Sequence, residues 1–199
     1  GRAVKGVLAN APVEAAVYAG LDAEGEHSWN VIGTTTTDAN GYFGFNLGTQ
    51  SAPVRVRVTT DAETTMVCDT PSGCLVSPPA NFGESGTPAA GMILDTIVSG
   101  ADFAGPVAVT PMTHMAATWL QAFPQALDDN NVLLAHKRLA VLFGFTDDTY
   151  VSQRVPDLTD AFERNFALSS DEQALRHAIF SASLQETAIV ASLPIDSLA

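Results

Sequence analysis

The two cysteines, Cys68 and Cys74, are the residues whose spacing most directly indicates chemistry. They bracket the segment CDTPSGC, in which Pro71, Ser72 and Gly73 favour a turn that brings the two sulfur atoms together. We therefore predict a disulfide, which in so short a loop contributes roughly 2 kcal/mol in the chain-entropy model. A disulfide indicates an oxidising compartment. Half of a zinc site is the alternative, but no second pair of Cys or His follows at ligand spacing.

A second candidate site lies in the stretch TTTTDANGYFGFNL, which covers residues 34–47. Asp38 and Asn40 match the start of the calcium-loop pattern D-x-[DN]-x-[DN]-G, but the third ligand and the distant Glu are missing at the required offsets. They remain incomplete candidates for a metal site. Asp38 to Gly41 supply side-chain caps and residues that tolerate positive φ, so this segment predicts a hairpin turn.

Motifs for catalysis are also incomplete. The segment FGESGTP approaches the nucleophile motif G-x-S-x-G, but that motif needs Gly where the chain has Thr87. His114, His136 and His177 fall on three different expected helices, which a bundle could gather, whereas His27 lies in the first half. None of the histidines has the H-x-x-H, H-E-x-x-H or E-x-x-H spacing of a metal site.

Adjacent carboxylates occur at Asp128-Asp129 and at Asp147-Asp148, both at expected junctions of helix and loop. Neighbouring residues on a helix do not share a face, so these acids are interpreted as caps and solvated ends. A glycosidase needs two carboxyl groups across a groove, which a sequence does not reveal. We therefore expect no catalytic residues, no cofactor and no enzymatic activity.

Composition restricts the choice of partners. The 199 residues include 22 Asp and Glu against 9 Lys and Arg, a formal net charge of −13. Such a surface repels phosphate backbones, and no basic run interleaved with aromatics offsets the repulsion, so nucleic acid is excluded as a partner. No apolar run approaches the ~20 residues of a membrane span, and no signal peptide opens the chain, so we expect a soluble, already processed or trimmed chain.

The first half has the pattern of a β-sandwich, with short runs rich in Val and Thr separated by turn residues. In VRVRV, three valines fall on one face, while Arg55 and Arg57 fall on the other, toward water or a neighbouring carboxylate. After the hairpin turn, Phe43, Phe45 and Leu47 should enter the core. The expected strands, about seven, cover residues 3–9, 15–21, 29–37, 42–47, 54–60, 92–98 and 106–110.

The second half has the pattern of a small three-helix bundle, because Ala and Leu replace Val and Thr and the apolar period approaches 3.6. Thr110 and Pro111 predict a helix over 111–123, with Met112, Met115, Ala116, Trp119 and Leu120 as its apolar stripe. A second helix should begin after Asp128 or Asp129 and end before Gly144. A capping box of Ser169 and Glu172 predicts the start of a third. Residues 146–166 are interpreted as a loop that leaves room for one short helix.

The segments GRAVKGVLANAPVEAAVYAG and TTTTDANGYFGFNL together resemble the carboxypeptidase regulatory-like (transthyretin-like) β-sandwich family. In that family a G-x-V strand leads to a-P-V-x-x-A-x-V and then to a T-D-x-x-G-x-F-x-F hairpin. The match covers residues 1–60 well and 60–108 loosely, and it implies an accessory sandwich on secreted or surface proteins, usually without catalytic residues. The segment 61–91 departs from the family as an insertion, and loops of that length are often functional.

The second half is similar to bacterial secreted lipoproteins in which such a sandwich is followed by V-T-P-L-T-x-L-A, by A-x-x-F-G and by A-L-x-x-L-S-Q-x-A. Here these motifs become VTPMTHMAA, LAVLFGF and IFSASLQETA. Most of those proteins lack an assigned activity. The resemblance implies an extracytoplasmic location, in the periplasm, on an outer-membrane-anchored surface or secreted, with a tether through an upstream lipidated Cys that this sequence does not contain.

Together these observations predict an α+β chain with an Ig/transthyretin-like antiparallel sandwich over 1–108 and helices over 109–199. The leading hypothesis is a non-catalytic extracytoplasmic module in adhesion, assembly or partner binding, with a protein or glycan partner at the cell surface. The alternative is a small-molecule or carbohydrate-binding protein with a site between sandwich and helices. Candidate ligand-binding residues are Trp29, Tyr42, Asn81 and Phe82, while Trp119 is expected in the core.

Overall fold

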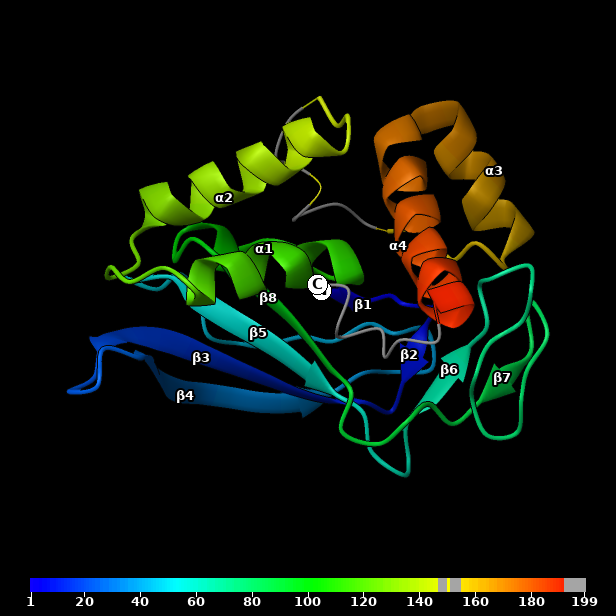
Figure 1. The fold of residues 1–199 in the computed structure, drawn as a ribbon, viewed down its shortest axis with the longest axis horizontal. Coiled ribbons are helices and arrows are strands. Elements are labelled where there is room, and N and C mark those ends of the chain that lie inside the picture. Colours follow the sequence, from blue (N-terminus) through cyan, green and yellow to red (C-terminus); the bar gives the residue numbers. More distant parts are fainter. Residues whose placement is uncertain (147–149, 151–154, 192–199) are drawn as a thin grey trace.

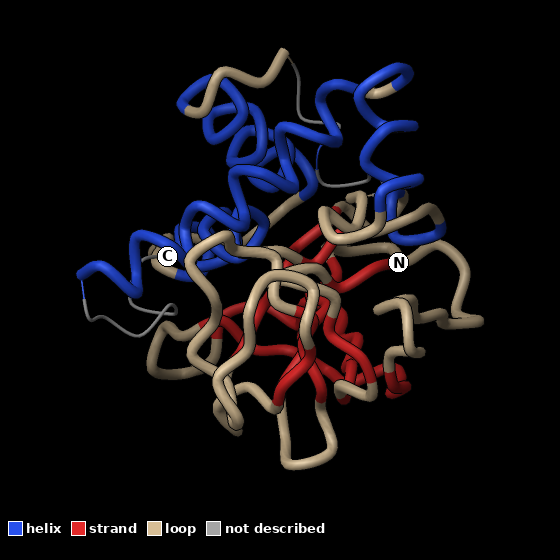
Figure 2. Tube along the Cα trace, turned by 90° about the vertical axis from the view of Figure 1, so that its right-hand side faces the viewer, coloured by secondary structure: helices blue, strands red, loops and turns tan. Residues whose placement is uncertain are grey.

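The fold is α+β, as expected, with antiparallel sheets in the N-terminal half and four helices after them (Figure 1). The computed structural model describes residues 1–146, 150 and 155–191, and side chains as far as residue 184. In two views at right angles the helices form one layer and the strands another beneath it (Figure 1, Figure 2).

The largest sheet has the strand order β4-β3-β5-β8, and every neighbouring pair is antiparallel. Its strands are β3 (Pro12–Leu21), β4 (His27–Thr36), β5 (Val54–Thr59) and β8 (Ile93–Val98). The alternation in VRVRV is confirmed, because Val54, Val56 and Val58 are buried while the two arginines between them are half-buried. This alternation gives the sheet one mainly apolar face, on which Thr96 lies opposite Val56, and one mixed face.

Two smaller sheets complete the β part. One pairs β2 (Leu8–Ala9), β6 (Thr65–Val67) and β7 (Ser85–Gly86) in antiparallel fashion, and the other pairs β1 (Arg2–Ala3) with β9 (Ala108–Val109) in parallel. The predicted strand over 3–9 is divided because Gly6 adopts a φ of 59° and turns the chain. The main hydrophobic core lies between the large sheet and these small ones, and it includes Leu8, Val13, Val56, Met66 and Cys68.

The predicted strand over 42–47 is wrong, although the turn before it is confirmed. Asp38 Oδ1 accepts hydrogen bonds from the N–H groups of Asn40 and Tyr42 at 2.8 and 2.9 Å. Beyond the turn the chain leaves β4, because Phe43 N–H donates to the carbonyl of Gly1. Phe43 is buried in the core as expected, and Phe45 and Leu47 pack against it from partly buried positions. Side-chain burial holds this segment without a strand ladder.

The first two predicted helices are confirmed as α1 (Pro111–Gln121) and α2 (Asp129–Leu142). Thr110 and Asp128 are their N-caps, and each forms a capping box with the residue three positions later. Among the described residues, no helix is long and apolar enough to cross a membrane.

The predicted third helix is wrong in its start, and the described residues form four α-helices rather than three. Helix α3 (Ala161–Ser170) occupies the end of the predicted loop, and α4 (Glu172–Ala191) follows after one residue. Ser169 lies inside α3, where its hydroxyl donates to the carbonyl of Phe166, so it caps nothing. Asp171 takes that role, because its Oδ1 accepts from Ala174 N–H. Asp147-Asp148 lies outside the described residues.

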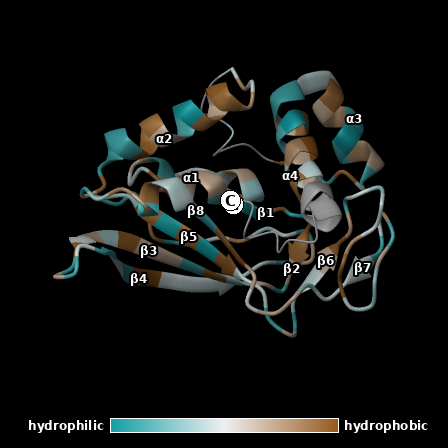
Figure 3. Ribbon diagram, viewed as in Figure 1, coloured by the Kyte–Doolittle hydropathy of each residue, from teal (hydrophilic) through white to brown (hydrophobic). Residues whose placement is uncertain are grey.

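The helices α1 and α2 cover the mixed face of the large sheet. A second core joins Tyr18 and Ile97 of the sheet to Ala117, Leu120 and Val132 of the helices. His136 of α2 ties the layers together, because its Nε2 donates to the carbonyl of Ile97 at 2.7 Å. Coloured by hydropathy, α2, α3 and α4 carry hydrophobic segments as the strands do (Figure 3).

Candidate functional site

An apolar cleft lies where the disulfide loop meets the helices α3 and α4. Its volume is about 550 Å³, and we call it the junction cleft. The described residues that line it come from the loop after Cys68, from the turn at Phe82, from the segment before α3 and from α3 and α4: Asp69, Thr70, Pro71, Phe82, Leu158, Arg164, Asn165, Leu168, Leu175, Ile179, Ala182 and Ser183.

The first wall of the cleft is fixed by the predicted disulfide, which the structure contains. Cys68 and Cys74 are bonded, with Cα atoms 5.6 Å apart, and both are buried. Between them the Thr70 hydroxyl donates to the Gly73 carbonyl at 2.9 Å, and Gly73 N–H donates back to the Thr70 carbonyl at 3.0 Å. The covalent bond and this turn hold the backbone of Asp69 to Pro71 at the cleft.

The second wall is the α3–α4 pair, and a partly buried ion pair anchors it to the β part. Arg2 Nη1 lies 2.6 Å from Glu163 Oε2 on α3 and donates to the Val155 carbonyl at 2.9 Å. Glu163 also lies in the first turn of the helix, where its N–H donates to Oδ1 of the N-cap residue Asp160 at 2.8 Å. Arg164 on the next position donates to the Leu158 carbonyl, which closes the turn before the helix.

Three large hydrophobic side chains meet at the cleft while still facing solvent. Phe82 is 43% exposed, Leu168 is 65% exposed and Ile179 is 52% exposed. They come from three separate segments, so the exposure is concentrated by the fold and not by a local run of apolar residues. Exposed apolar surface that gathers in a concave site is typical of a binding site.

The loop wall of the cleft contains a buried carboxylate. Asp69 is 4% exposed, and its Oδ2 accepts from Gly6 N–H at 2.7 Å. Its Oδ1 has no hydrogen-bond partner in the part of the chain that the structure describes. Burial raises the pKa of Asp69, against the opposing effects of this hydrogen bond and of Lys5. The desolvated oxygen is an acceptor that a bound hydrogen-bond donor would stabilise.

Lys5 is the charge partner of Asp69. It is 5% exposed, and burial lowers its pKa to about 8, although the Asp69 carboxylate opposes the shift. Desolvation therefore outweighs pairing for both groups. The pair is a feature that sequence reasoning missed, and the signal available was a single Lys within the apolar run AVKGVLA.

Of the four ligand-binding residues expected from the sequence, Phe82 alone lines the junction cleft. Its neighbour Asn81 closes a turn, because its N–H and its Nδ2 both donate to Glu84 Oε2, at 2.8 and 3.0 Å. Asn81 therefore sets the position of Phe82 and belongs to the scaffold of the site.

Trp29 and Tyr42 lie elsewhere, each beneath a guanidinium group. Arg55 lies over the Trp29 ring at 5.0 Å, and Tyr18 packs edge-on against the same ring. Arg2 lies over the Tyr42 ring at 4.7 Å. In each case a guanidinium group already covers one face of the ring, and neither ring lines the junction cleft. These two residues therefore do not form the expected stacking platform for a ligand in that cleft.

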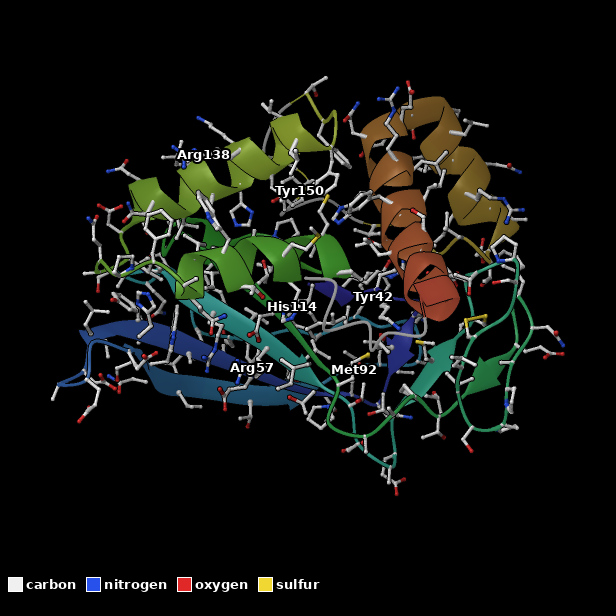
Figure 4. All side chains as sticks on the ribbon, viewed as in Figure 1. Tyr42, Arg57, Met92, His114, Arg138 and Tyr150 are labelled. Carbon is white, nitrogen blue, oxygen red and sulfur yellow. A yellow bond between two sulfur atoms is a disulfide. The ribbon has the colours of Figure 1, made fainter. Side chains whose placement is uncertain are left out.

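The arginines of VRVRV meet carboxylates on the mixed face of the sheet, as expected. Arg57 forms two hydrogen bonds of 2.8 Å with Asp95, and Arg55 lies 3.4 Å from Glu14. The side-chain hydrogen bond to Asp95 raises the pKa of Arg57, whereas burial lowers that of Arg55. His114 of α1 lies at the edge of this group, where its Nδ1 accepts from Asp95 N–H (Figure 4).

The histidines are gathered only in part. His136 and His177 both pack against the ring of Tyr150, each with ring centroids 5.5 Å apart, while His114 and His27 bond elsewhere. Within residues 1–146, 150 and 155–191, no group of three His, Cys, Asp or Glu side chains could hold a metal ion. Asp38 Oδ1 is used by its turn, so the arrangement there is that of a structural cap.

Comparisons with protein families, with curated proteins and with solved structures find no match for this chain. The family resemblance of the sequence therefore remains a hypothesis.

Proposed function

We propose that this chain is a non-catalytic, extracytoplasmic module of a bacterial surface or secreted protein, and that it binds a protein partner through the junction cleft. The observation that carries this proposal is the convergence of Phe82, Leu168 and Ile179 on one apolar cleft of about 550 Å³ while they remain exposed. Solvation of three large apolar side chains is unfavourable, so a partner that covers them gains free energy from their burial.

The disulfide supports the extracytoplasmic part of the proposal. Cys68 and Cys74 form a bond that persists in an oxidising compartment, and the loop that they close builds one wall of the cleft. The proposed location and the proposed binding site are therefore linked. In a reducing compartment the disulfide would break, and the segment from Asp69 to Pro71 would no longer be held at the cleft.

The proposed family is the carboxypeptidase regulatory-like, or transthyretin-like, sandwich, with the helices as an addition. Support comes from the sequence motifs and from a core between the four-stranded sheet and the two smaller ones. In this interpretation the insertion over 61–91 has a role, because it contains the disulfide loop and Phe82, which line the junction cleft together with α3 and α4.

A small-molecule site in the same cleft is the second candidate. It is favoured by a volume within the range of ligand pockets, about 300–1,000 Å³, and by the unpartnered Oδ1 of Asp69. A ligand of this kind would combine an apolar body with a hydrogen-bond donor. In this form the alternative uses Phe82 and not Trp29 or Tyr42.

The test is site-specific crosslinking followed by measured affinity. A photo-crosslinking phenylalanine at position 82 should capture a partner protein on intact cells of the source organism. Leu75 is the matched control position, because it is 76% exposed and directly follows Cys74 but lies outside the cleft lining. Calorimetry with the purified partner should then give a Kd about tenfold higher for Leu168→Ser, as expected for an interface hot spot.

Leu75→Ser should bind within twofold of the wild type, since it is as exposed as Leu168 and lies on the neighbouring loop. Equal capture at positions 75 and 82, or equal Kd values for the two serine variants, would contradict the assignment of the cleft.

A further inference from the structure

A second apolar groove lies between α1 and α2, remote in sequence from the disulfide loop. Its volume is about 480 Å³, and we call it the helical groove. The residues that line it are almost all apolar, and one of them is an arginine: Met115, Ala116, Thr118, Trp119, Ala122, Ala135, Arg138, Leu139 and Leu142.

Trp119 is the largest side chain of the groove, and the expectation that it belongs to the core is wrong. It is 37% exposed and packs edge-on against Phe123. The apolar stripe of α1 is divided by the fold, because Met112 and Leu120 are buried whereas Trp119 lies at the groove. A helix packed between a sheet and another helix has an apolar flank on each side.

Among the described residues that line the groove, Arg138 alone carries a formal charge. Its guanidinium carbon lies 5.3 Å from the centroid of the Trp119 ring. Among the described arginines it alone has neither a hydrogen bond nor an ion pair. In a chain with 22 acidic and 9 basic residues, an uncommitted guanidinium over an apolar groove is unexpected.

We infer that the helical groove binds an amphiphilic monocarboxylate, with its apolar body against Trp119 and Leu142 and its carboxylate on Arg138. Guanidinium has a planar set of donors that matches a carboxylate in a two-bond geometry. The apolar lining supplies burial for a hydrocarbon body, and the groove volume lies within the range of ligand pockets, about 300–1,000 Å³. The charge of the site therefore complements an anion, even though the molecule as a whole is acidic.

This site is separate from the junction cleft and from any partner bound there. The two linings share none of the residues that the structure describes. The two proposals can consequently fail independently, and each has a variant that leaves the other intact.

The experiment is a titration of the full chain with dodecanoate below its micelle concentration, at 0.15 M salt. Because the chain has two tryptophans, Trp29→Phe makes Trp119 the only fluorescent indole. We expect a saturable change in Trp119 fluorescence with one site per chain, and calorimetry should give the same Kd. Up to the length that the groove accommodates, each added methylene should tighten binding about fourfold.

The carboxylate contact is tested with ligands and variants that change charge alone. Dodecanol, which lacks the carboxylate, should bind about 10- to 100-fold more weakly than dodecanoate. Arg138→Gln should weaken dodecanoate by a similar factor and leave dodecanol unchanged. Lys137→Gln is the matched control, since Lys137 is the exposed neighbouring cation on α2 but does not line the groove. It should change the Kd by less than twofold.

Two outcomes would overturn the inference. One is equal affinity for dodecanoate and dodecanol, or an unchanged dodecanoate Kd in Arg138→Gln, with far-UV circular dichroism showing that the variant is folded. The other is loss of dodecanoate binding in Phe82→Ala with retention in Arg138→Gln, which would place the amphiphile in the junction cleft and favour the small-molecule alternative there.

Discussion

His177 shows how burial fixes the protonation of a single residue. It is completely buried, and burial lowers its pKa to about 3, against about 6.5 in an unfolded chain. Below pH 6.5 the unfolded state gains a proton that the folded state does not accept, so the free energy of unfolding decreases as pH falls. The loss approaches about 1.4 kcal/mol per pH unit, which amounts to about 2 kcal/mol between pH 7 and pH 5.

Urea unfolding at these two pH values measures this effect, with His177→Gln as the comparison. The variant should show a pH dependence smaller by about 2 kcal/mol. If the variant does not fold, the ring resonances of His177 in the wild type supply the test, because they should remain those of neutral imidazole at pH 5. Protonation near pH 6 would contradict the prediction.

The disulfide gives a second prediction at the residue scale. Replacing Cys68 and Cys74 by alanine should lower the free energy of unfolding by about 2 kcal/mol, because the unfolded chain regains the freedom of the short loop. For a chain of this length that corresponds to a decrease in Tm of about 4–8 °C. A reducing agent should lower the Tm of the wild type and leave the double variant unchanged. Equal effects on both proteins would show that the agent acts elsewhere.

The N-caps of α1 and α2 show that the same capping motif contributes more to the free energy of unfolding when the cap residue is buried. Thr110 is buried, and its Oγ1 accepts from Thr113 N–H at 3.2 Å while it also bonds His177 Nε2 at 2.8 Å. Asp128 is exposed, and its Oδ1 accepts from Asn131 N–H at 2.7 Å. Thr110→Ala removes a cap and leaves a buried imidazole nitrogen without its partner, so we expect a loss of about 2–4 kcal/mol. Asp128→Ala should cost about 1 kcal/mol.

Chemical denaturation of both alanine variants tests the ranking. Thr110→Ser retains the hydroxyl and should recover more than half of the loss, despite the missing methyl group. A ranking in which Asp128→Ala is the more destabilising variant would show that burial of the cap is not the deciding factor.

At the scale of the whole molecule, the sheet and the helices share hydrophobic core residues. Ile97 and Tyr18 of the sheet pack with Leu120 and Val132 of the helices. We therefore expect one cooperative unfolding transition for both halves of the chain. In Trp119→Phe the remaining tryptophan, Trp29, reports on β4, and far-UV circular dichroism at 222 nm reports on the helices.

The two signals should have the same urea midpoint within this one variant. Loss of the helical signal at a lower urea concentration than the change at Trp29 would mean that the helical part folds as a separate unit. The same comparison with Trp29→Phe places the probe in α1 and provides an internal check.

The sequence predicted only those residues of the candidate site that lie close together along the chain. The Cys pair, the turn residues around Asn81 and the neighbouring Phe82 are close in sequence, so the disulfide loop was recognised before the fold. Leu168 and Ile179 belong to helices whose boundary at Asp171 was missed, and they line one cleft with Phe82 although they lie 86 and 97 residues further along the chain. The side-chain periods of helices and strands span only a few residues, so they do not predict which segments so far apart in the sequence will pack together.

What the sequence determined by itself is what depends on near neighbours: the α+β division, the alternation of VRVRV, the cap Thr110, a second cap at Asp128 or Asp129, and the disulfide. These follow from backbone sterics, hydrogen bonds and side-chain periods of a few residues. The tertiary structure alone decided that Tyr42 bonds β1 instead of continuing a hairpin, that Lys5 and Asp69 are buried together, and that Trp119 faces a groove beside Arg138. Burial and long-range pairing set these features, because the free energy of a contact depends on how far residues distant in the sequence exclude water from it.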